Sequence, residues 1–411
     1  MIKRNLSPSV VEALGDTPVV LLVGARQTGK STLVRSLPGS HHTRRYLSLD
    51  DQGVLEAARS DPAGFLAGLD GPVTLDEVQK APELFPAMKA VVDRDRMPGR
   101  YLLTGSANVL LLPRLSESLA GRMEVHTLWP FSQGELKGRR ETFLDGVFAN
   151  KYSPTLSKKG TSTDWMEKVC LGGFPEAVIR TSAARRRAWF QSYVTTVLSH
   201  DARDLANIES LASLPRLLAL LASRAASLLN YSDLSRTLGM PQSTLKRYMG
   251  LLQALFLYYP LPAWSNNLGQ RLIKSPKVLI SDTGLLAYLS GASPDRFRQE
   301  PALAGHLLEN FVAMELVKQA SWSENPVQLS HFRTLAGIEV DLVLEDQAGR
   351  VIGLEVKASA TPSSSDFKGL KALAECAGGK FVRGILLYTG REVIPFAKNL
   401  TALPIPAIWE S

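Results

Sequence analysis

The stretch GARQTGKS, residues 24–31, decides the fold of the N-terminal part of the chain. It matches the phosphate-binding pattern G-x-x-x-x-G-K-[ST], follows the apolar run VVLLV (19–23) and leads into the helix-like STLVRSL (31–37). Glycines let backbone N–H groups turn toward phosphates, a lysine offers charge to the β and γ oxygens, and a serine hydroxyl can ligate magnesium. The stretch therefore predicts an α/β domain with a site for ATP and Mg²⁺, formed by Gly24, Ala25, Arg26, Gln27, Thr28, Gly29, Lys30, Ser31 and Thr32.

An acidic pair ends another apolar run, PVTLDE (72–77). Two acids at a strand end, taken alone, are more often a solvated turn. Beside a phosphate-binding loop they have the chemistry that ATP hydrolysis requires. We expect Asp76 to hold magnesium together with Ser31, and Glu77 to polarise the attacking water, with Lys30 and Glu77 as catalytic residues.

Length and composition indicate a globular protein of several domains. The chain has 411 residues, 45% of them hydrophobic and 21% charged, which excludes a disordered chain or a coiled rod. Its net charge of +8 favours a polyanionic partner, although many mildly basic proteins bind no polyanion. The only cysteines, Cys170 and Cys376, are far apart, which argues against a disulfide framework or a zinc ribbon. No targeting segment or membrane span is visible, so we expect a cytoplasmic location.

Changes of pattern along the chain predict its domains. Apolar runs alternate with helix-like stretches up to about residue 149, which predicts a parallel sheet covered by helices. Residues 150–164 are rich in Ser, Thr, Lys and Gly and are expected to form an exposed insert or linker. Helical periodicity fills residues 165–265, and strands return within 266–411.

The middle region contains the outline of a helix-turn-helix, YSDLSRTLGMPQSTLKRYMGLLQAL, residues 231–255. We expect a turn from Gly239 to Gln242 and a second helix capped by Ser243. The helix would bury an apolar face and expose polar residues near its N-terminal end, where they could meet DNA phosphates or bases. Such units also serve packing and dimerisation alone, and that alternative stays open. The buried face would be Leu245, Met249, Leu252 and Leu255 or Phe256, and the candidate DNA contacts are Thr244, Lys246 and Arg247, with Gln242 beside them.

Carboxylates and a lysine recur on two C-terminal strands. In IEVDLVLE (338–345), alternation places Asp341 on the face opposite Ile338, Val340 and Leu342. In VIGLEVKAS (351–359), Glu355 and Lys357 share a face and could converge with Asp341 across a hairpin, and Glu309 on the preceding helix could complete the cluster. Such a set can gather magnesium and orient water for attack on a phosphodiester. Cross-strand pairing without chemistry is the alternative.

The motifs together resemble a family of AAA-type P-loop ATPases of bacteria and archaea that carry a C-terminal domain of unknown function. The resemblance covers nearly the whole chain, and its carriers are GARQTGKSTL, LDEVQKAPELF, LLTGSAN, SLAGRMEVHTLWPFSQGE, LGGFPEAV, KSPKVLISDTGLL, GHLLENFVAMEL, IEVDLVLE and GLEVKAS. It implies an α/β fold with a P-loop AAA-type ATPase domain, a helical or winged-helix middle and a restriction-endonuclease-like C-terminal domain. That last fold is also used for DNA binding without cleavage.

The resemblance also implies roles for polar residues beyond the loop. Asn108, or the neighbouring Ser106, would sense the γ-phosphate. Arg122 would be a catalytic arginine that reaches the nucleotide of a neighbouring subunit, with Arg114 as the competing candidate. A charge supplied across an interface would make hydrolysis depend on assembly into a homo-oligomer, for which a hexamer is one option. A surface arginine that caps a helix is the alternative for Arg122.

Two functions are compatible with these features. The first is an ATP-driven motor or remodeller that binds DNA, for which branched DNA is the form expected to stimulate hydrolysis best. The second is an ATP-dependent regulatory or defence switch that binds a protein partner. Stimulation of ATP hydrolysis by nucleic acid distinguishes them.

Overall fold

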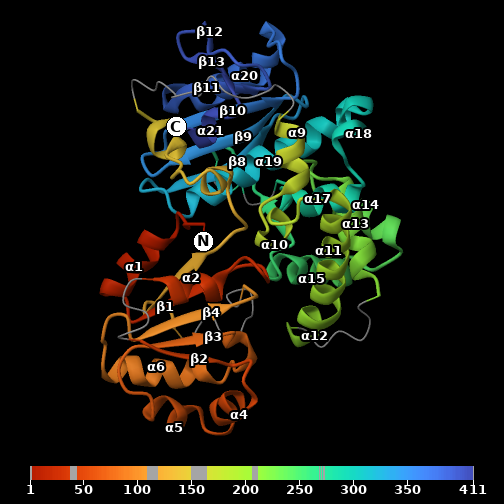
Figure 1. Ribbon diagram of the computed structural model, residues 1–411. Helices are drawn as coiled ribbons and strands as arrows, with labels where there is room; N and C mark the ends of the chain where they lie inside the picture. The colour runs from red at the N-terminus through yellow and green to blue at the C-terminus, as the bar shows by residue number, and fades with distance from the viewer. Residues whose placement is uncertain are drawn as a thin grey trace. The chain divides into compact units, whose positions relative to one another are not determined.

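A computed structural model describes residues 2–37, 44–108, 119–149, 164–205, 212–267, 269, 271 and 274–410 (Figure 1). The chain packs into two compact units that share its middle region. The first unit comprises Met1–Pro130, Thr195–Leu211 and Arg247–Leu257, and the second comprises Phe131–Val194, Ala212–Lys246 and Tyr258–Ser411. The expected domain boundaries remain a prediction, and the expected insert at 150–164 falls almost wholly outside the described residues.

The first unit is built on a five-stranded parallel sheet of order β2-β3-β4-β1-β5. Each strand coincides with one of the apolar runs in the sequence, so the predicted parallel sheet is confirmed. Strand β1 is buried along its whole length and pairs with β4 on one side and β5 on the other. The strands are β1 (Val19–Val23), β2 (Arg45–Ser48), β3 (Val73–Asp76), β4 (Tyr101–Gly105) and β5 (Met123–Thr127).

Helices join the strands of this sheet, and their sequences explain where they begin and which face they bury. The Asp51 carboxylate accepts a hydrogen bond from the Val54 N–H and caps one helix, and Asp61 caps the next in the same way. Helix α6 (Leu84–Arg94), the longest of the helices that join these strands, has a buried stripe at helical spacing, Leu84, Phe85, Met88 and Val92. The helices of the sheet region are α1 (Ser7–Asp16), α2 (Lys30–Ser36), α4 (Gln52–Ser60), α5 (Pro62–Ala67) and α6 (Leu84–Arg94), with a 3₁₀ turn at Val78–Lys80.

Helices dominate the middle of the chain, as the periodicity predicts. The described ones are α7 (Gln133–Leu136), α8 (Phe143–Gly146), α9 (Asp164–Leu171), α10 (Pro175–Val178), α11 (Ala183–Thr196), a π-helical turn at Val197–Asp201, α12 (Ala202–Leu205), α13 (Leu214–Ser223), α14 (Tyr231–Leu238) and α15 (Gln242–Ala254). A short antiparallel pair, β6 (Tyr258–Leu261) and β7 (Lys277–Ile280), follows α15, and then come α17 (Thr283–Ser290), α18 (Pro294–Gln299) and α19 (Pro301–Ala320).

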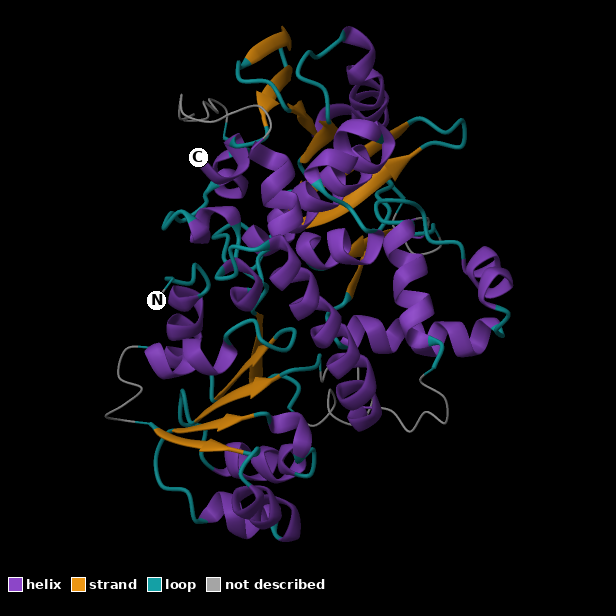
Figure 2. Ribbon diagram, turned by 45° about the vertical axis from the view of Figure 1, so that its right-hand side comes forward, coloured by secondary structure: helices purple, strands orange, loops and turns teal. Residues whose placement is uncertain are grey.

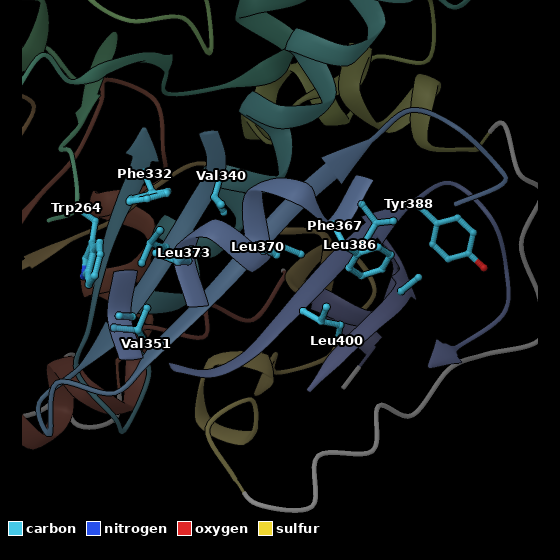
Figure 3. Close-up of a cluster of buried hydrophobic side chains, with 13 residues drawn as sticks. Trp264, Phe332, Val340, Val351, Phe367, Leu370, Leu373, Leu386, Tyr388 and Leu400 are labelled. Atoms are coloured by element: carbon cyan, nitrogen blue, oxygen red, sulfur yellow. The ribbon is translucent and has the colours of Figure 1, made fainter. Parts of the chain in front are cut away.

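The second unit contains a six-stranded mixed sheet of order β12-β13-β11-β10-β9-β8. Helix α20 (Lys368–Ala377) packs on it, and side chains from Phe332, Val340, Val351, Leu370 and Leu373 meet in one buried cluster (Figure 3). Figure 2 shows both sheets as orange strands bordered by purple helices. The strands are β8 (Val327–Arg333), β9 (Glu339–Asp346), β10 (Val351–Lys357), β11 (Phe381–Tyr388), β12 (Ile394–Ala397) and β13 (Leu400–Pro404), and the short helix α21 (Ala407–Glu410) ends the described chain.

The expected clean alternation of acidic and apolar residues along β9 is wrong. Phe332 pairs with Val340 and Ser330 pairs with Val343, so three residues of β9 advance against two of β8. This β-bulge brings Val340 and Val343 into the same buried cluster, although simple alternation assigns them to opposite faces.

Candidate functional site

The phosphate-binding loop lies at the carboxyl end of β1, where its backbone requires glycine. A Cβ at Gly24 would overlap the carbonyl oxygen of Leu128, and Gly29 has φ +95° at the start of α2. Gln27 also has a positive φ of 63°, which is uncommon for a residue with a side chain. The loop therefore has the tight turn and the close backbone approach that its sequence predicts.

Lys30 is folded back over this loop. Its ammonium donates hydrogen bonds to the carbonyl oxygens of Gly24 at 2.8 Å and Ala25 at 3.0 Å, and the residue is only 4% exposed. Burial lowers the pKa of Lys30 to about 8, although the carboxylates of Glu77 and Asp76 act in the opposite direction. A polyphosphate would add negative charge at this position and favour the charged ammonium.

The Asp76 carboxylate accepts hydrogen bonds from hydroxyl groups on three different elements, α2, β2 and β4. The Ser31 Oγ lies 2.9 and 3.1 Å from its two carboxylate oxygens, and Tyr46 and Thr104 donate to it as well. Burial and the hydrogen bond to Asp76 raise the pKa of Tyr46 to about 12. Oxygen ligands from a carboxylate and a hydroxyl are those that Mg²⁺ prefers, so Ser31 and Asp76 fit the expected ion.

Glu77 stands beside Asp76 in a left-handed backbone conformation, with φ 61°. Its N–H donates to the Thr104 hydroxyl at 3.2 Å. The amide of Gln79 donates both to the Glu77 carboxylate and, at 2.8 Å, to the Ser106 hydroxyl. Strained backbone of this kind costs about 1–3 kcal/mol and persists where the surroundings hold it, often at functional sites. Gln79 thus joins the expected water-activating acid to one expected phosphate sensor, a link that the sequence analysis missed.

The other expected sensor, Asn108, is half-buried, and its backbone N–H donates to the Ala254 carbonyl oxygen at 2.7 Å.

Arg4 supports the loop from the N-terminal segment and was missed by the sequence analysis. Its guanidinium donates to the carbonyl oxygen of Thr28 at 2.8 Å and to that of Trp129, and the residue is buried. No local motif marks this arginine, because both acceptors are backbone atoms distant in the sequence.

An ion pair at the loop was also missed. Arg26 Nη1 lies 2.6 Å from the Asp201 carboxylate, which belongs to the part of the middle region that packs in the first unit.

Arg122 lies far from the P-loop of the same chain. It directly precedes β5, and its carbonyl oxygen accepts from the N–H of Val19 at the first residue of β1, whereas the loop follows the last residue of β1. Five residues of strand separate the two ends by about 17 Å. The guanidinium pairs with Asp93 and donates to the Ala120 carbonyl oxygen at 2.9 Å. The competing Arg114 lies outside the described residues.

The expected helix-turn-helix corresponds to α14 and α15. Gly239 has φ 66° and ends α14, as the expected turn requires. Helix α15 already begins at Gln242, so the expected cap at Ser243 is wrong, and Ser243 lies inside the first turn. Lys246 and Arg247 are exposed and Thr244 is half-buried. The predicted apolar face is confirmed, since its members are nearly inaccessible: Leu245, Met249, Leu252, Leu255 and Phe256.

The expected C-terminal carboxylates gather around a lysine that the sequence analysis did not assign. Lys277, the first residue of β7, places its ammonium 2.6 Å from Glu309 and 3.3 Å from Asp341. The Val356 N–H donates to the other oxygen of Asp341 at 2.9 Å. A lysine in the short, otherwise apolar run KVLI was the available signal.

The remaining expected pair adjoins this cluster. Lys357 lies 2.8 Å from one oxygen of Glu355, and the second oxygen is buried with no hydrogen-bond partner among the residues that the structure describes. Burial, and then the charge of Asp341, raise the pKa of Glu355 to about 8, and the same two causes raise that of Glu309 to about 8. Burial alone would lower the pKa of Lys277, but Glu309 and Asp341 outweigh it and raise it.

These carboxylates do not fit a metal centre. Over the described ranges of the chain, no three His, Cys, Asp or Glu side chains are placed to hold a metal ion together. The ammonium of Lys277 bonds to two of the carboxylates, so part of their negative charge is balanced within the cluster.

No helix of the described segments combines the length and the apolar character that crossing a membrane requires.

Comparison with known families divides the chain into three parts. Residues 16–137 match an AAA domain, and residues 162–296 and 304–408 match two domains of unknown function, DUF8612 and DUF4143. The first match confirms the predicted AAA-type ATPase domain, and the last does not test the nuclease-like fold.

Similar proteins were found by sequence and by structure. The chain is 32% identical to the uncharacterized protein Rv2008c of Mycobacterium tuberculosis over 408 residues, which cover 99% of this chain and 84% of the relative. The Walker-type ATPase PABY2304 of Pyrococcus abyssi is similar with a TM-score of 0.44 and 16% identity, over 70% of this chain and 96% of that one. RuvB of Thermotoga maritima, a Holliday junction branch migration motor, is similar with a TM-score of 0.30 and 17% identity, over 62% and 88%.

Proposed function

The chain belongs to one family with Rv2008c of Mycobacterium tuberculosis, and we propose that it is an ATPase whose hydrolysis drives work on DNA. The AAA domain at residues 16–137 establishes the ATPase type of the fold. The main observation in support of ATP hydrolysis is the hydrogen bond between the Ser31 hydroxyl and the Asp76 carboxylate. It lies beside a P-loop whose Gly24 carbonyl oxygen accepts a hydrogen bond from Lys30.

Different residues of the P-loop unit would bind the phosphates, hold Mg²⁺ and activate the attacking water. Lys30 and the loop N–H groups would bind the β- and γ-phosphates. Ser31 and Asp76 would hold Mg²⁺, which neutralises charge on the phosphates when bound. Glu77, held in place by Gln79, would orient the attacking water and accept its proton, and Ser106 or Asn108 would contact the γ-phosphate.

Arg122 is proposed to act on a neighbouring subunit. Its place at the opposite end of β1 from the P-loop supports this role, because it cannot approach a nucleotide bound by its own loop. A homo-oligomer would bring the arginine of one copy to the γ-phosphate of the next, where it would neutralise charge that develops during phosphoryl transfer.

DNA contact is proposed for the N-terminal half of α15. Lys246 and Arg247 are exposed there, while the apolar face of the helix is buried. The short antiparallel sheet of β6 and β7, which follows α15 in the chain, supports the proposal of a winged helix. Two adjacent cations and a net charge of +8 suit the phosphate backbone and not a particular base sequence.

The C-terminal sheet is proposed to have a nuclease-like fold that contacts DNA without cutting it. The ammonium of Lys277 binds Glu309 and Asp341 at the position that a divalent cation would have to occupy. We expect no nicking of plasmid DNA with Mg²⁺ or Mn²⁺. Nicking that disappears in Asp341→Ala and Lys357→Ala while ATP turnover persists would overturn this part of the proposal.

A binding titration tests the DNA proposal. The affinity for single-stranded, duplex and branched DNA is measured by fluorescence anisotropy across a salt series. Log affinity should fall linearly with log salt, and the double reversal Lys246→Glu, Arg247→Glu should weaken binding and flatten the slope. The matched reversal Lys89→Glu, Arg94→Glu on α6, where both residues are exposed, should change binding less. Absence of binding at low salt would favour the protein-binding switch.

A further inference from the structure

A segment from the middle of the chain returns to the ATPase unit. The described residues 195–205 pack with the first unit, although the chain up to residue 194 belongs to the second. Within this segment, Val197–Asp201 form a π-helical turn, a rare local structure that is often found at functional sites. Asp201 is the last residue of the turn and is only 8% exposed.

Asp201 holds a cation of the phosphate-binding loop. Its carboxylate lies 2.6 Å from Nη1 of Arg26, the third residue of GARQTGKS. The Asp201 side chain is 10% exposed and that of Arg26 is 47% exposed, so the carboxylate is the fixed partner and the guanidinium has room to move. The contact joins residues 175 positions apart in the sequence.

The negative charge of Asp201 reaches the nucleotide site. It acts on the ammonium of Lys30 in the same direction as Glu77 and Asp76. A bound polyphosphate would meet this charge as repulsion, and the repulsion would be stronger for ATP than for ADP because ATP carries more charge. While Arg26 is paired with Asp201, its guanidinium is also less available to the phosphates.

We propose that Asp201 is a positioning residue that couples ATP binding to the π-helical turn. In this inference, Arg26 exchanges Asp201 for the terminal phosphate of ATP. Asp201 then loses its ion pair with Arg26 in a buried position, and the turn shifts in response. The inference rests on ATP binding at the P-loop and not on DNA as the partner.

The exchange makes opposite predictions for the two partners. Removing the charge of Asp201 removes both the repulsion and the competition for Arg26, so ATP should bind more tightly. Removing Arg26 leaves Asp201 facing the phosphates, so ATP should bind more weakly. A salt bridge that only stabilises the fold would leave ATP affinity equal in all variants that fold.

The test is a titration of the full chain with fluorescent ATP and ADP. Asp201→Asn should tighten ATP binding by about threefold to tenfold and ADP binding by less. Arg26→Ala should weaken ATP binding, and the double variant should lie close to the wild type. His200→Asn, an exposed neighbour in the same turn, is the matched control and should bind like the wild type.

Hydrogen exchange of the peptides that cover residues 195–205 gives a second readout. ATP should increase exchange there in the wild type and leave it unchanged in Asp201→Asn. The inference is overturned if Asp201→Asn melts like the wild type but binds ATP no more tightly and responds to ATP in the same way. If the wild type binds no ATP at all, the proposed function fails as well, so the two failures are distinguishable.

Discussion

The P-loop site and the Lys277 cluster combine the same side chains in opposite ways. Each unites a buried aspartate with a buried lysine. At the P-loop, the lysine bonds to backbone carbonyl oxygens, and Asp76 is held by hydroxyl groups. In the C-terminal sheet, Lys277 bonds directly to Glu309 and Asp341.

The difference shows why carboxylates alone do not make a metal site. Hydroxyl donors fix the position of Asp76 but leave its charge to be balanced by a cation such as Mg²⁺. An internal ammonium balances the charge around Lys277, so the cluster contributes to stability and electrostatics without an ion. The same residue types are therefore proposed to support catalysis in one unit and structure in the other.

The largest expected effect comes from breaking the P-loop site. Glu77→Gln should bind ATP normally but turn over about 10²–10⁴-fold more slowly, because the acid acts mainly on the water. Lys30→Ala should lose nucleotide binding itself, because Lys30 meets the ground-state phosphates. Binding and steady-state hydrolysis are measured on both, with Glu83→Gln, an exposed acid nearby, as control. Near-normal turnover in Glu77→Gln would remove it as the activating residue.

A second experiment asks whether the P-loop site is complete within one chain. Arg122→Ala should keep ATP affinity and assembly but lose about 10²–10³-fold in hydrolysis. Mixing it with Lys30→Ala should restore activity, because one variant supplies the arginine and the other the intact loop. No recovery, together with a wild type that stays monomeric with ATP at every concentration, would contradict a role across subunits.

Removing Lys277 should break the other half of the comparison. Lys277→Met leaves Glu309 and Asp341 buried without their ammonium, so the free energy of unfolding should fall by about 3–5 kcal/mol. Denaturant unfolding followed by tryptophan fluorescence measures it. Lys371→Met, at an exposed position on α20, is the control and should stay within about 0.5 kcal/mol of the wild type. An unchanged stability of Lys277→Met would show that the carboxylates are neutralised in another way.

The smallest expected effect is a pH dependence of stability. In the folded protein the pKa values of Glu309 and Glu355 are about 8, above that of a free glutamate, so the folded state binds more protons than the unfolded state. Their contribution is fully present below the unfolded pKa of about 4.5 and is lost as pH rises through 8. Glu355→Gln should flatten the fall in melting temperature between these limits. An unchanged slope would contradict the buried, protonated state.

The P-loop sheet was predictable because its signals are local. The loop motif fixes Lys30 and Ser31 by spacing, and an apolar run leads directly to Asp76. The strands β1 and β3 are parallel in one sheet, with β4 between them, so their carboxyl ends bring these residues to the same edge. Arg4 and Asp201 reach the same loop from distant segments, and the bonds of Arg4 to Thr28 and Trp129 go to backbone atoms. No spacing in the sequence encodes such contacts.

The carboxylates and Lys357 of the C-terminal cluster were predictable from the sequence, but Lys277 and the balance of charge were not. Strand alternation indicated Asp341, Glu355 and Lys357, and their proximity follows from the hairpin. Lys277 enters from a different strand pair, and the bulge in β9 adds one residue that no composition signal marks. The balance of charge, which decides between a metal site and an internal ion pair, therefore required the structure.

The ATPase rate of the wild type with and without DNA tests the central claim most directly. Hydrolysis is followed at low and moderate salt with single-stranded, duplex and branched DNA, and Glu77→Gln reports the background. The account predicts that DNA increases the rate, with branched DNA most effective, and that salt removes the increase as it removes binding. If no form of DNA binds or changes the rate at low salt, the claim is contradicted, and an ATP switch that binds a protein partner takes its place.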